Sequence, residues 1–269
     1  MANNSSLSKR AALRQQQEME ERSKRNKRIL TIGGAIAAIT VIAVIAIVAI
    51  QAMGRGVGMA EEQLTPPNAT EGYGVLVGGK SPVEGTPHLI IYEDFQCPAC
   101  AAREAEYGPA VDQLVANGDI TAEFRFAYFL DGAGREGGAS HRAALAAAAA
   151  DQVGAFDEYH KVVYANQSNS GGYSDSKLRD EFAEQAGITG EDLDEFKRLY
   201  NTKAFWDFTK NANQKFNDEE IGSTPTYQVS GEKLEFYDQN SQQVLIQPTP
   251  DDMLRAITEA YEAGGQEQE

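Results

Sequence analysis

The sequence predicts an α/β domain in which strands flank a large helical block, with one transmembrane helix in front of it. Three observations lead to this prediction. Residues 29–54 contain no charged side chain. A short apolar run leads directly into a Cys-Pro-Ala-Cys segment, and two strand-like runs follow the helical block. The expected order is β-β-α-β, the helical block, then β-β-α.

The amino-terminal region has a charge opposite to that of the whole chain. Residues 1–28 carry eight basic and three acidic side chains, whereas the 269-residue chain has a net charge of −16. About 20 apolar residues suffice to span a bilayer, and a positive flank stays in the cytoplasm. The sequence therefore predicts a basic cytoplasmic tail over 1–28 and a transmembrane signal anchor over 29–53. A cleaved signal peptide is the alternative, but its apolar core is usually shorter and ends at an A-x-A-like site.

The rest of the chain is predicted to be extracytoplasmic. Its negative charge argues against a nucleic-acid partner, because phosphate binding depends on clustered basic residues. A hydrophobic share of 42% allows a sizeable core. Glycine and proline indicate a linker over 54–72. The folded domain is expected over 73–263, and a flexible carboxyl-terminal tail over 264–269.

The first half of the domain contains three predicted strands and one helix. The helix begins at the Cys-Pro-Ala-Cys segment, ends near Asn117 and Gly118, and contains Gly108-Pro109, where a bend is expected. Apolar runs and aromatic β-formers predict the strands. These strands cover residues 73–77, 88–92 and 120–130.

The second half begins with a helical block over about 132–217. Within it, apolar residues recur at three- and four-residue steps between Leu193 and Phe216, which predicts one long helix with a single buried face. Two strands, 226–229 and 233–237, follow around a turn at Ser230-Gly231. A last helix over 249–262 is indicated by Thr249 as N-cap and Pro250 in its first turn.

Cys97 and Cys100 carry the predicted chemistry. Residues three apart on a helix lie on one face, close enough for a disulfide after modest adjustment. Pro98 belongs in a first helical turn, so Cys97 is placed at the amino terminus of the helix. The helix dipole there favours a thiolate and lowers its pKa. Cys97 is thus the expected nucleophile, and Cys100 the thiol that resolves the mixed disulfide.

Other interpretations of these cysteines are weaker. A structural disulfide would close so short a loop that it would remove little unfolded-state entropy. A structural zinc needs about four ligands, and His88, His141 and His160 lack paired spacing, so no metal is expected. Two unrelated buried thiols would not need the Cys-Pro-x-Cys spacing after a buried strand.

Three segments resemble a DsbA-type thiol:disulfide interchange protein of the membrane-anchored, thioredoxin-like branch found in actinobacteria. They are 91–100, which ends in Cys-Pro-Ala-Cys, 155–160 after an alanine-rich helix, and 221–227, which contains Thr224-Pro225. The similarity spans about 75–261. It implies a thioredoxin-like fold with an inserted helical domain over about 132–217.

The resemblance also implies roles for individual residues. Pro225 matches a proline that is cis in such families and faces the cysteine pair, leaving the backbone of Thr224 free to pair with an extended substrate. The dipeptide Pro98-Ala99 would tune the reduction potential together with Thr224. Many relatives have a buried acid where this chain has Ile91. Here Glu93 and Asp94 are the candidates for handling the proton of Cys100, or they are ordinary solvated acids.

The implied function is thiol-disulfide exchange on exported polypeptides at the outer face of the cell membrane. The preferred direction is oxidation through a Cys97-Cys100 disulfide. No cofactor is required, because both electrons reside on the sulfurs. A membrane quinone reductase of the DsbB or VKOR type is the expected reoxidant. A reductase or isomerase with the same site is the alternative, and a non-catalytic binding module is a second one.

Overall fold

In the computed structural model, residues from Gly58 onward form one compact unit. The predicted cytoplasmic tail and transmembrane anchor lie outside the described residues. No helix in the described part of the chain is both long and apolar enough to cross a membrane. The structure describes residues 58–132, 134–167, 172–238, 240–241 and 243–266.

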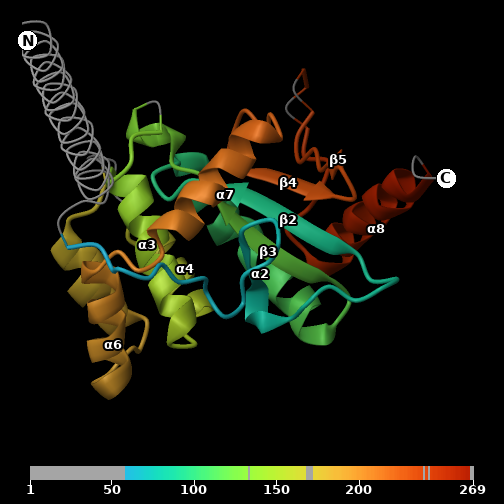
Figure 1. The fold of residues 1–269 in the computed structure, drawn as a ribbon. Helices are drawn as coiled ribbons and strands as arrows, with labels where there is room; N and C mark the ends of the chain where they lie inside the picture. The colour runs from blue at the N-terminus through green and yellow to red at the C-terminus, as the bar shows by residue number, and fades with distance from the viewer. Residues whose placement is uncertain (1–57, 133, 168–171, 239, 242, 267–269) are drawn as a thin grey trace, which may run out of the picture. The chain divides into compact units, whose positions relative to one another are not determined.

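A five-stranded sheet with the order β1-β3-β2-β4-β5 forms the centre of the domain (Figure 1). β2 and β3 are parallel, and the other neighbouring pairs are antiparallel. The strand order along the chain agrees with the prediction. The strands are β1 (Gly74–Leu76), β2 (His88–Glu93), β3 (Thr121–Phe126), β4 (Thr226–Val229) and β5 (Glu232–Lys233).

Three strands are shorter than predicted: β1 by one residue at each end, and β3 and β5 by more. β3 ends at Phe126, and a short 3-10 helix, η2 (Phe129–Asp131), replaces the expected continuation to residue 130. The side-chain oxygen of Asn213 accepts the backbone N–H of Tyr128 at 2.9 Å, which takes a donor that a longer strand would need. Of the predicted 233–237 strand, only Lys233 lies in β5, which begins one residue earlier at Glu232 and pairs with β4. Tyr237 instead forms an isolated bridge with Val244.

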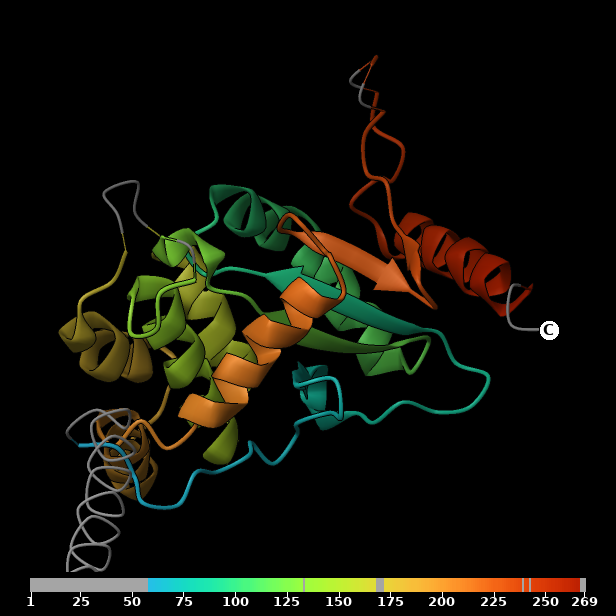
Figure 2. The ribbon, with the colours of Figure 1, turned by 45° about the horizontal axis from the view of Figure 1, so that its top comes forward.

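Helices cover both faces of the sheet. Side chains alternate along a strand, so Leu89, Ile91 and Glu93 of β2 share one face. This face packs under α2 (Pro98–Asn117) and α8 (Pro250–Gln266). The opposite face, which includes Tyr92, packs against Phe216 of α7 (Trp206–Asp218). Figure 2 shows α7 crossing one side of the strands, with α8 beside β4 and β5.

The helices between β3 and β4 form the predicted helical insertion. Its alanine-rich helix α3 (Ala139–Gln152) is buried along most of its length and packs against α4 (Phe156–Ala165). Small alanine side chains allow the neighbouring helices to approach closely. A π-helical turn, η3 (Lys177–Glu181), runs into the one-turn α5 (Phe182–Gln185).

The single long helix predicted between Leu193 and Phe216 is wrong. The chain forms α6 (Gly190–Asn201) and α7, separated by a break in which Lys203 has a φ of 50°. The carbonyls of Thr202 and Ala204 accept backbone N–H groups from an earlier segment, each at 2.7 Å. These carbonyls are therefore used for tertiary contacts instead of helix continuation.

That earlier segment, residues 58–72, belongs to the predicted linker. It lies along the helical insertion, because its donors at Ala60 and Leu64 bond to the break between α6 and α7. Asn68 adds two hydrogen bonds to the carboxylate of Asp151, at 2.9 Å and 2.8 Å. Residues 58–72 of the predicted linker therefore pack against the helical insertion.

The carboxyl-terminal elements follow local turn and capping signals. Ser230 and Gly231 both have positive φ, 50° and 91°, as a two-residue hairpin turn requires. The hydroxyl oxygen of Thr249 accepts the N–H of Asp252 at 3.3 Å, as expected of an N-cap. α8 continues to Gln266, past the predicted end at residue 262 and into the predicted tail.

Candidate active site

The two cysteines lie where β2 gives way to α2. Cys97 is the N-cap of α2 with an extended backbone, and Pro98 occupies the first turn. Both thiols are free and buried, and Cys97 has 8% of its surface exposed. The first turn leaves backbone N–H groups unpaired, so the Cys97 sulfur sits at the positive end of a 20-residue helix. This arrangement suits a sulfur anion.

Thr224 and Pro225 face this sulfur from the far end of the sequence. β4 pairs antiparallel with β2, with Thr226 opposite Tyr92, so the turn before β4 lies beside the end of β2. The peptide bond between Thr224 and Pro225 is cis. The Cys97 thiol donates to the backbone carbonyl of Thr224 at 3.3 Å. The hydroxyl of Thr224 is buried and has no other partner, so it can donate to the sulfur once this is ionised.

The two thiols differ strongly in acidity. Hydrogen bonding from the Cys100 thiol is the main cause that lowers the pKa of Cys97 to about 5, against the effect of burial. The Thr224 hydroxyl and the N–H groups of Cys100 and Ala99 lower it further. Burial is the main cause that raises the pKa of Cys100, and the Cys97 and Glu93 charges add to it. Around neutral pH, Cys97 is a thiolate and Cys100 a thiol.

Glu93 is one of the two acids singled out as proton carriers. It is buried and shares the sheet face of Ile91, one pleat nearer the cysteines, which explains how it can replace the acid that relatives carry at the position of Ile91. Its Oε1 lies 2.5 Å from Nε2 of His160 on α4. Burial raises the pKa of Glu93, and His160 opposes this. A carboxyl that titrates above its ordinary range can exchange a proton with a thiol.

Asp94 points elsewhere and holds the active-site loop. Its carboxylate accepts the N–H of Gln96 at 2.9 Å, the N–H of Leu130 at 3.1 Å and the hydroxyl of Ser140 at 2.5 Å. Burial raises its pKa to about 6, and these hydrogen bonds limit the rise. Neither acid is an ordinary solvated side chain, because both are buried. Of the two carboxylates, that of Glu93 is the one whose charge raises the pKa of Cys100, which favours Glu93 as the proton carrier.

The helical insertion supplies active-site contacts that the sequence did not reveal. The Gln167 amide donates to the carbonyls of Phe95 and Cys97 at 2.8 Å and 3.0 Å, and the Tyr173 hydroxyl donates to Phe95 at 2.8 Å. The amide of Gln96 reaches Asp131 at 2.7 Å on the other side. Gln167 and Tyr173 lie in irregular segments and Asp131 ends η2, none of them within a recognisable motif, so only the folded chain identifies them.

The three histidines have partners other than a metal. His88 lies 3.4 Å from Glu123, and His141 contacts Thr209 at 2.9 Å. His160, which the sequence marked only as unsuitable for zinc, pairs with Glu93. Among the described residues, no three His, Cys, Asp or Glu side chains are arranged to hold a metal ion.

Known proteins share this fold. A family model described as Thioredoxin matches residues 79–248, more than half of the chain. The chain belongs to the thioredoxin family. No curated protein sequence matches it significantly.

Solved structures with this thioredoxin-family fold include proteins of the predicted type. The MdbA protein of Actinomyces oris, a thiol-disulfide oxidoreductase, has 20% identity and a TM-score of 0.56 over 76% of this chain and 97% of its own. MdbA of Corynebacterium diphtheriae has 22% identity and a TM-score of 0.54, covering 66% and 91%. DsbA of Mycobacterium tuberculosis has 24% identity and a TM-score of 0.51, covering 76% and 90%. The predicted resemblance to DsbA-type proteins and the thioredoxin-like fold with added helices are confirmed.

Proposed function

We propose that the chain is a thiol:disulfide oxidoreductase that introduces disulfides into exported polypeptides. The observation that carries this proposal is the unequal pair of thiols, with the Cys97 pKa lowered to about 5 beside a Cys100 thiol whose pKa is raised. A stabilised thiolate favours the reduced enzyme over its disulfide. An enzyme whose reduced form is stabilised is an oxidant, which is the basis of the high potential of DsbA.

The oxidative cycle follows from this inequality. A substrate thiolate attacks Sγ of Cys97, the Cys97-Cys100 bond breaks, and its electron pair leaves on Cys100, which takes up a proton. A second substrate thiolate then attacks the substrate sulfur of the mixed disulfide. Cys97 leaves with the electron pair as a thiolate, which its lowered pKa makes a good leaving group. The substrate gains a disulfide and the enzyme becomes a dithiol, so no cofactor is required.

The neighbours of the cysteines take supporting roles in this proposal. The backbone around Thr224, next to Pro225, would pair with an extended substrate segment, since it lies beside the attacking sulfur. Pro98 and Ala99 shape the first turn that stabilises the Cys97 anion. Glu93 would exchange a proton with the Cys100 sulfur, and Asp94 would hold the active-site loop in place through its hydrogen bonds.

We also propose that residues 29–53 anchor the domain at the outer face of the cell membrane, with residues 1–28 in the cytoplasm. The charge-free apolar stretch and its basic flank support this topology. An extracytoplasmic site is where disulfides form and persist. A membrane quinone reductase of the DsbB or VKOR type would return the dithiol to the disulfide.

The reduction potential of the Cys97-Cys100 pair tests the direction. The full-length chain in mild detergent is equilibrated with glutathione buffers, and the remaining thiols are counted by alkylation and mass. We expect a value near the DsbA end of the range, about −120 mV. A value near thioredoxin, about −270 mV, would make the chain a reductase.

Activity itself is tested by refolding of a reduced, disulfide-containing substrate with the wild-type chain and with Cys97→Ala. Equal rates in both would leave the non-catalytic binding module as the better interpretation. Attachment to the membrane is tested separately, by asking whether carbonate washing releases the chain from membranes of the expressing cells. Release would contradict the anchor but leave the redox proposal untouched.

A further inference from the structure

Glu93 is the first of three titratable groups in a row. His160 places Nε2 at 2.5 Å from Glu93 and turns Nδ1 toward Oε1 of Glu104, 3.9 Å away. The side chains of Glu93 and His160 are 3% and 1% exposed, whereas that of Glu104 is 13% exposed. The imidazole thus lies between a buried carboxyl group and one that reaches solvent.

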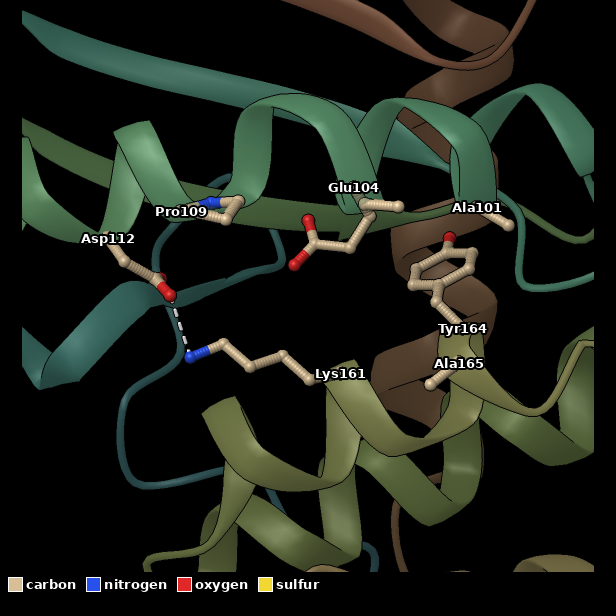
Figure 3. A pocket seen from close by; sticks show the side chains of 8 residues that line it. Ala101, Glu104, Pro109, Asp112, Lys161, Tyr164 and Ala165 are labelled. Carbon is tan, nitrogen blue, oxygen red and sulfur yellow. Dashed lines mark ion pairs between the residues drawn. The ribbon is translucent and has the colours of Figure 1, made fainter. Parts of the chain in front are cut away.

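Glu104 borders a groove of about 280 Å³ between α2 and α4. Figure 3 shows its carboxylate turned into this space, with the hydroxyl of Tyr164 near the Ala101 end. The Tyr164 hydroxyl is buried and has no hydrogen-bond partner. An ion pair between Lys161 and Asp112, 2.7 Å long, lies at the other end. Although alanine and proline form much of its lining, a groove of this size can hold water next to the carboxylate of Glu104.

The sequence of α2 makes room for this arrangement. A Cβ atom at Gly108 would lie only 2.6 Å from Oε1 of Glu104. Glycine and proline both disfavour a helix interior, yet Gly108 and Pro109 sit in the middle of α2. Pro109 has no N–H to donate to the carbonyl of Ala105. Ala105 and Pro109 both line the groove. The pair that predicted a bend therefore serves to seat Glu104.

We propose that Glu93, His160 and Glu104 form a relay that carries a proton between the Cys100 sulfur and the solvent in the groove between α2 and α4. This inference rests on the proposed thiol-disulfide exchange. The second sulfur of the pair is buried, so its proton needs a route that the exposed end of the helix does not offer. Glu93 would exchange the proton with Cys100, and His160 and Glu104 are positioning residues behind it.

The proton balance is the same in both directions of the exchange. During substrate oxidation, Cys100 leaves as a thiolate and Glu93 gives it a proton. His160 restores the proton on Glu93, and Glu104 restores it on His160 from groove water. During reoxidation, the Cys100 thiol loses its proton along the same route and the thiolate attacks the mixed disulfide at Cys97. No electrons pass through the relay, because they stay on the sulfurs.

The surroundings of His160 keep a proton available to it. Burial lowers the pKa of His160, but Glu93 on β2, Glu104 on α2 and Asp157 on its own helix raise it, and the net direction is upward. The hydroxyls of Tyr164 and Tyr227 and the Cys100 thiol also lie near these groups, and their raised pKa values keep all three protonated at neutral pH. The ring stacks on Phe124 at 4.0 Å, which fixes its orientation. His160 therefore keeps a proton that it can share with Glu93.

The test compares Glu104→Gln with Asp112→Asn in the full-length chain. Both changes remove one carboxylate from the same groove, but only Glu104 belongs to the relay. The reduced enzyme is mixed rapidly with oxidised glutathione between pH 5 and 9, and quenched samples separate formation of the Cys97 mixed disulfide from its resolution by Cys100. We expect Glu104→Gln to slow resolution about tenfold at pH 6–7 and to shift its pH profile. Asp112→Asn should resemble the wild type.

The absorbance of the Cys97 thiolate, followed against pH, gives the pKa of Cys97. This pKa should be the same in Glu104→Gln, in Asp112→Asn and in the wild type, so that a change in the resolution rate reports on Cys100. Equal resolution rates and pH profiles for Glu104→Gln and Asp112→Asn would overturn the relay. His160→Gln should show the larger defect, and circular dichroism shows whether it folds; if it does not, Glu104→Gln alone decides. A wild-type chain that does not exchange with glutathione would instead refute the proposed function.

Discussion

The Sγ atom of Cys97 lies 3.3 Å from the backbone carbonyl oxygen of Thr224, a residue 127 positions later in the chain. The side-chain hydroxyl of Thr224 is buried and otherwise unpartnered. One residue thus offers the sulfur an acceptor when it is a thiol and a donor when it is a thiolate. The acidity of Cys97 therefore depends on a residue outside its own helix.

Replacing Thr224 tests this dependence. Thr224→Val removes the donor and keeps the shape, so the pKa of Cys97 should rise from about 5. A hydrogen bond to a charged group is worth about 1.5 kcal/mol, which corresponds to a rise of roughly one pH unit. The thiolate absorbance near 240 nm, followed against pH, measures it. Thr224→Ser keeps the hydroxyl and serves as the control; identical titrations of the two variants would contradict the role of the hydroxyl.

The stability of the reduced chain should depend on pH through Cys97. Its pKa falls from 9.0 in the unfolded chain to about 5 in the folded one, so the stabilisation is complete above pH 9 and is lost as pH falls toward 5. We expect the difference in unfolding free energy between wild type and Cys97→Ala to grow by up to about 1.4 kcal/mol per pH unit in this window. Urea unfolding under reducing conditions measures it, and a difference that does not change with pH would argue against a thiolate.

Removing Asp94 should destabilise the fold as well as the active-site loop. Asp94→Ala leaves the backbone N–H groups of Gln96 and Leu130 and the Ser140 hydroxyl without their acceptor. The Ser140 hydroxyl is buried and the two N–H groups are partly buried, and an unsatisfied buried group costs about 1–3 kcal/mol, so we expect a total loss of about 2–4 kcal/mol. Thermal unfolding measures it. Glu235→Ala, at an exposed acid, should cost less than about 0.5 kcal/mol.

The contact between Asn68 and Asp151 should decide whether the segment 58–72 stays in place. Asn68→Ala removes the side-chain hydrogen bond to the buried carboxylate of Asp151 and keeps the one from the backbone N–H of residue 68. We expect faster cleavage within 58–72 by added protease and a loss of about 1–3 kcal/mol. Glu71→Ala, an exposed change in the same segment, is the control. Equal cleavage rates in the two variants would show that Asn68 does not hold the segment.

Local patterns predicted the parts of the fold that depend on neighbouring residues. The apolar run of β2, Pro98 in the first turn of α2 and Thr249 before α8 each combine a short-range pattern with a known physical preference. The position of Glu93 also followed from period-two alternation, since it shares the face of Ile91. The sequence could thus have favoured Glu93 over Asp94.

The parts that the sequence did not predict depend on distant partners. The break between α6 and α7 interrupts a continuous helical pattern, because the carbonyls of Thr202 and Ala204 bond to a segment about 140 residues earlier. His160 gave no sign of its role, since a lone histidine on a helix is usually a packing residue. Only the packing of α4 against α2 brings it to Glu93 and Glu104.

The hydrogen bonds from Gln167 and Tyr173 also bear on how this protein can be engineered. The carbonyls of Phe95 and Cys97 accept hydrogen bonds from these two residues, which lie in irregular segments of the helical insertion. Excising the insertion to leave a minimal strand-and-helix scaffold would leave the Phe95 carbonyl without either donor, two residues before the nucleophile, while the Cys97 carbonyl would keep only the N–H groups of Cys100 and Ala101. Grafting the Cys-Pro-Ala-Cys segment onto a smaller scaffold would lose the donors of the insertion in the same way. The insertion and the redox centre must therefore be transplanted as one unit.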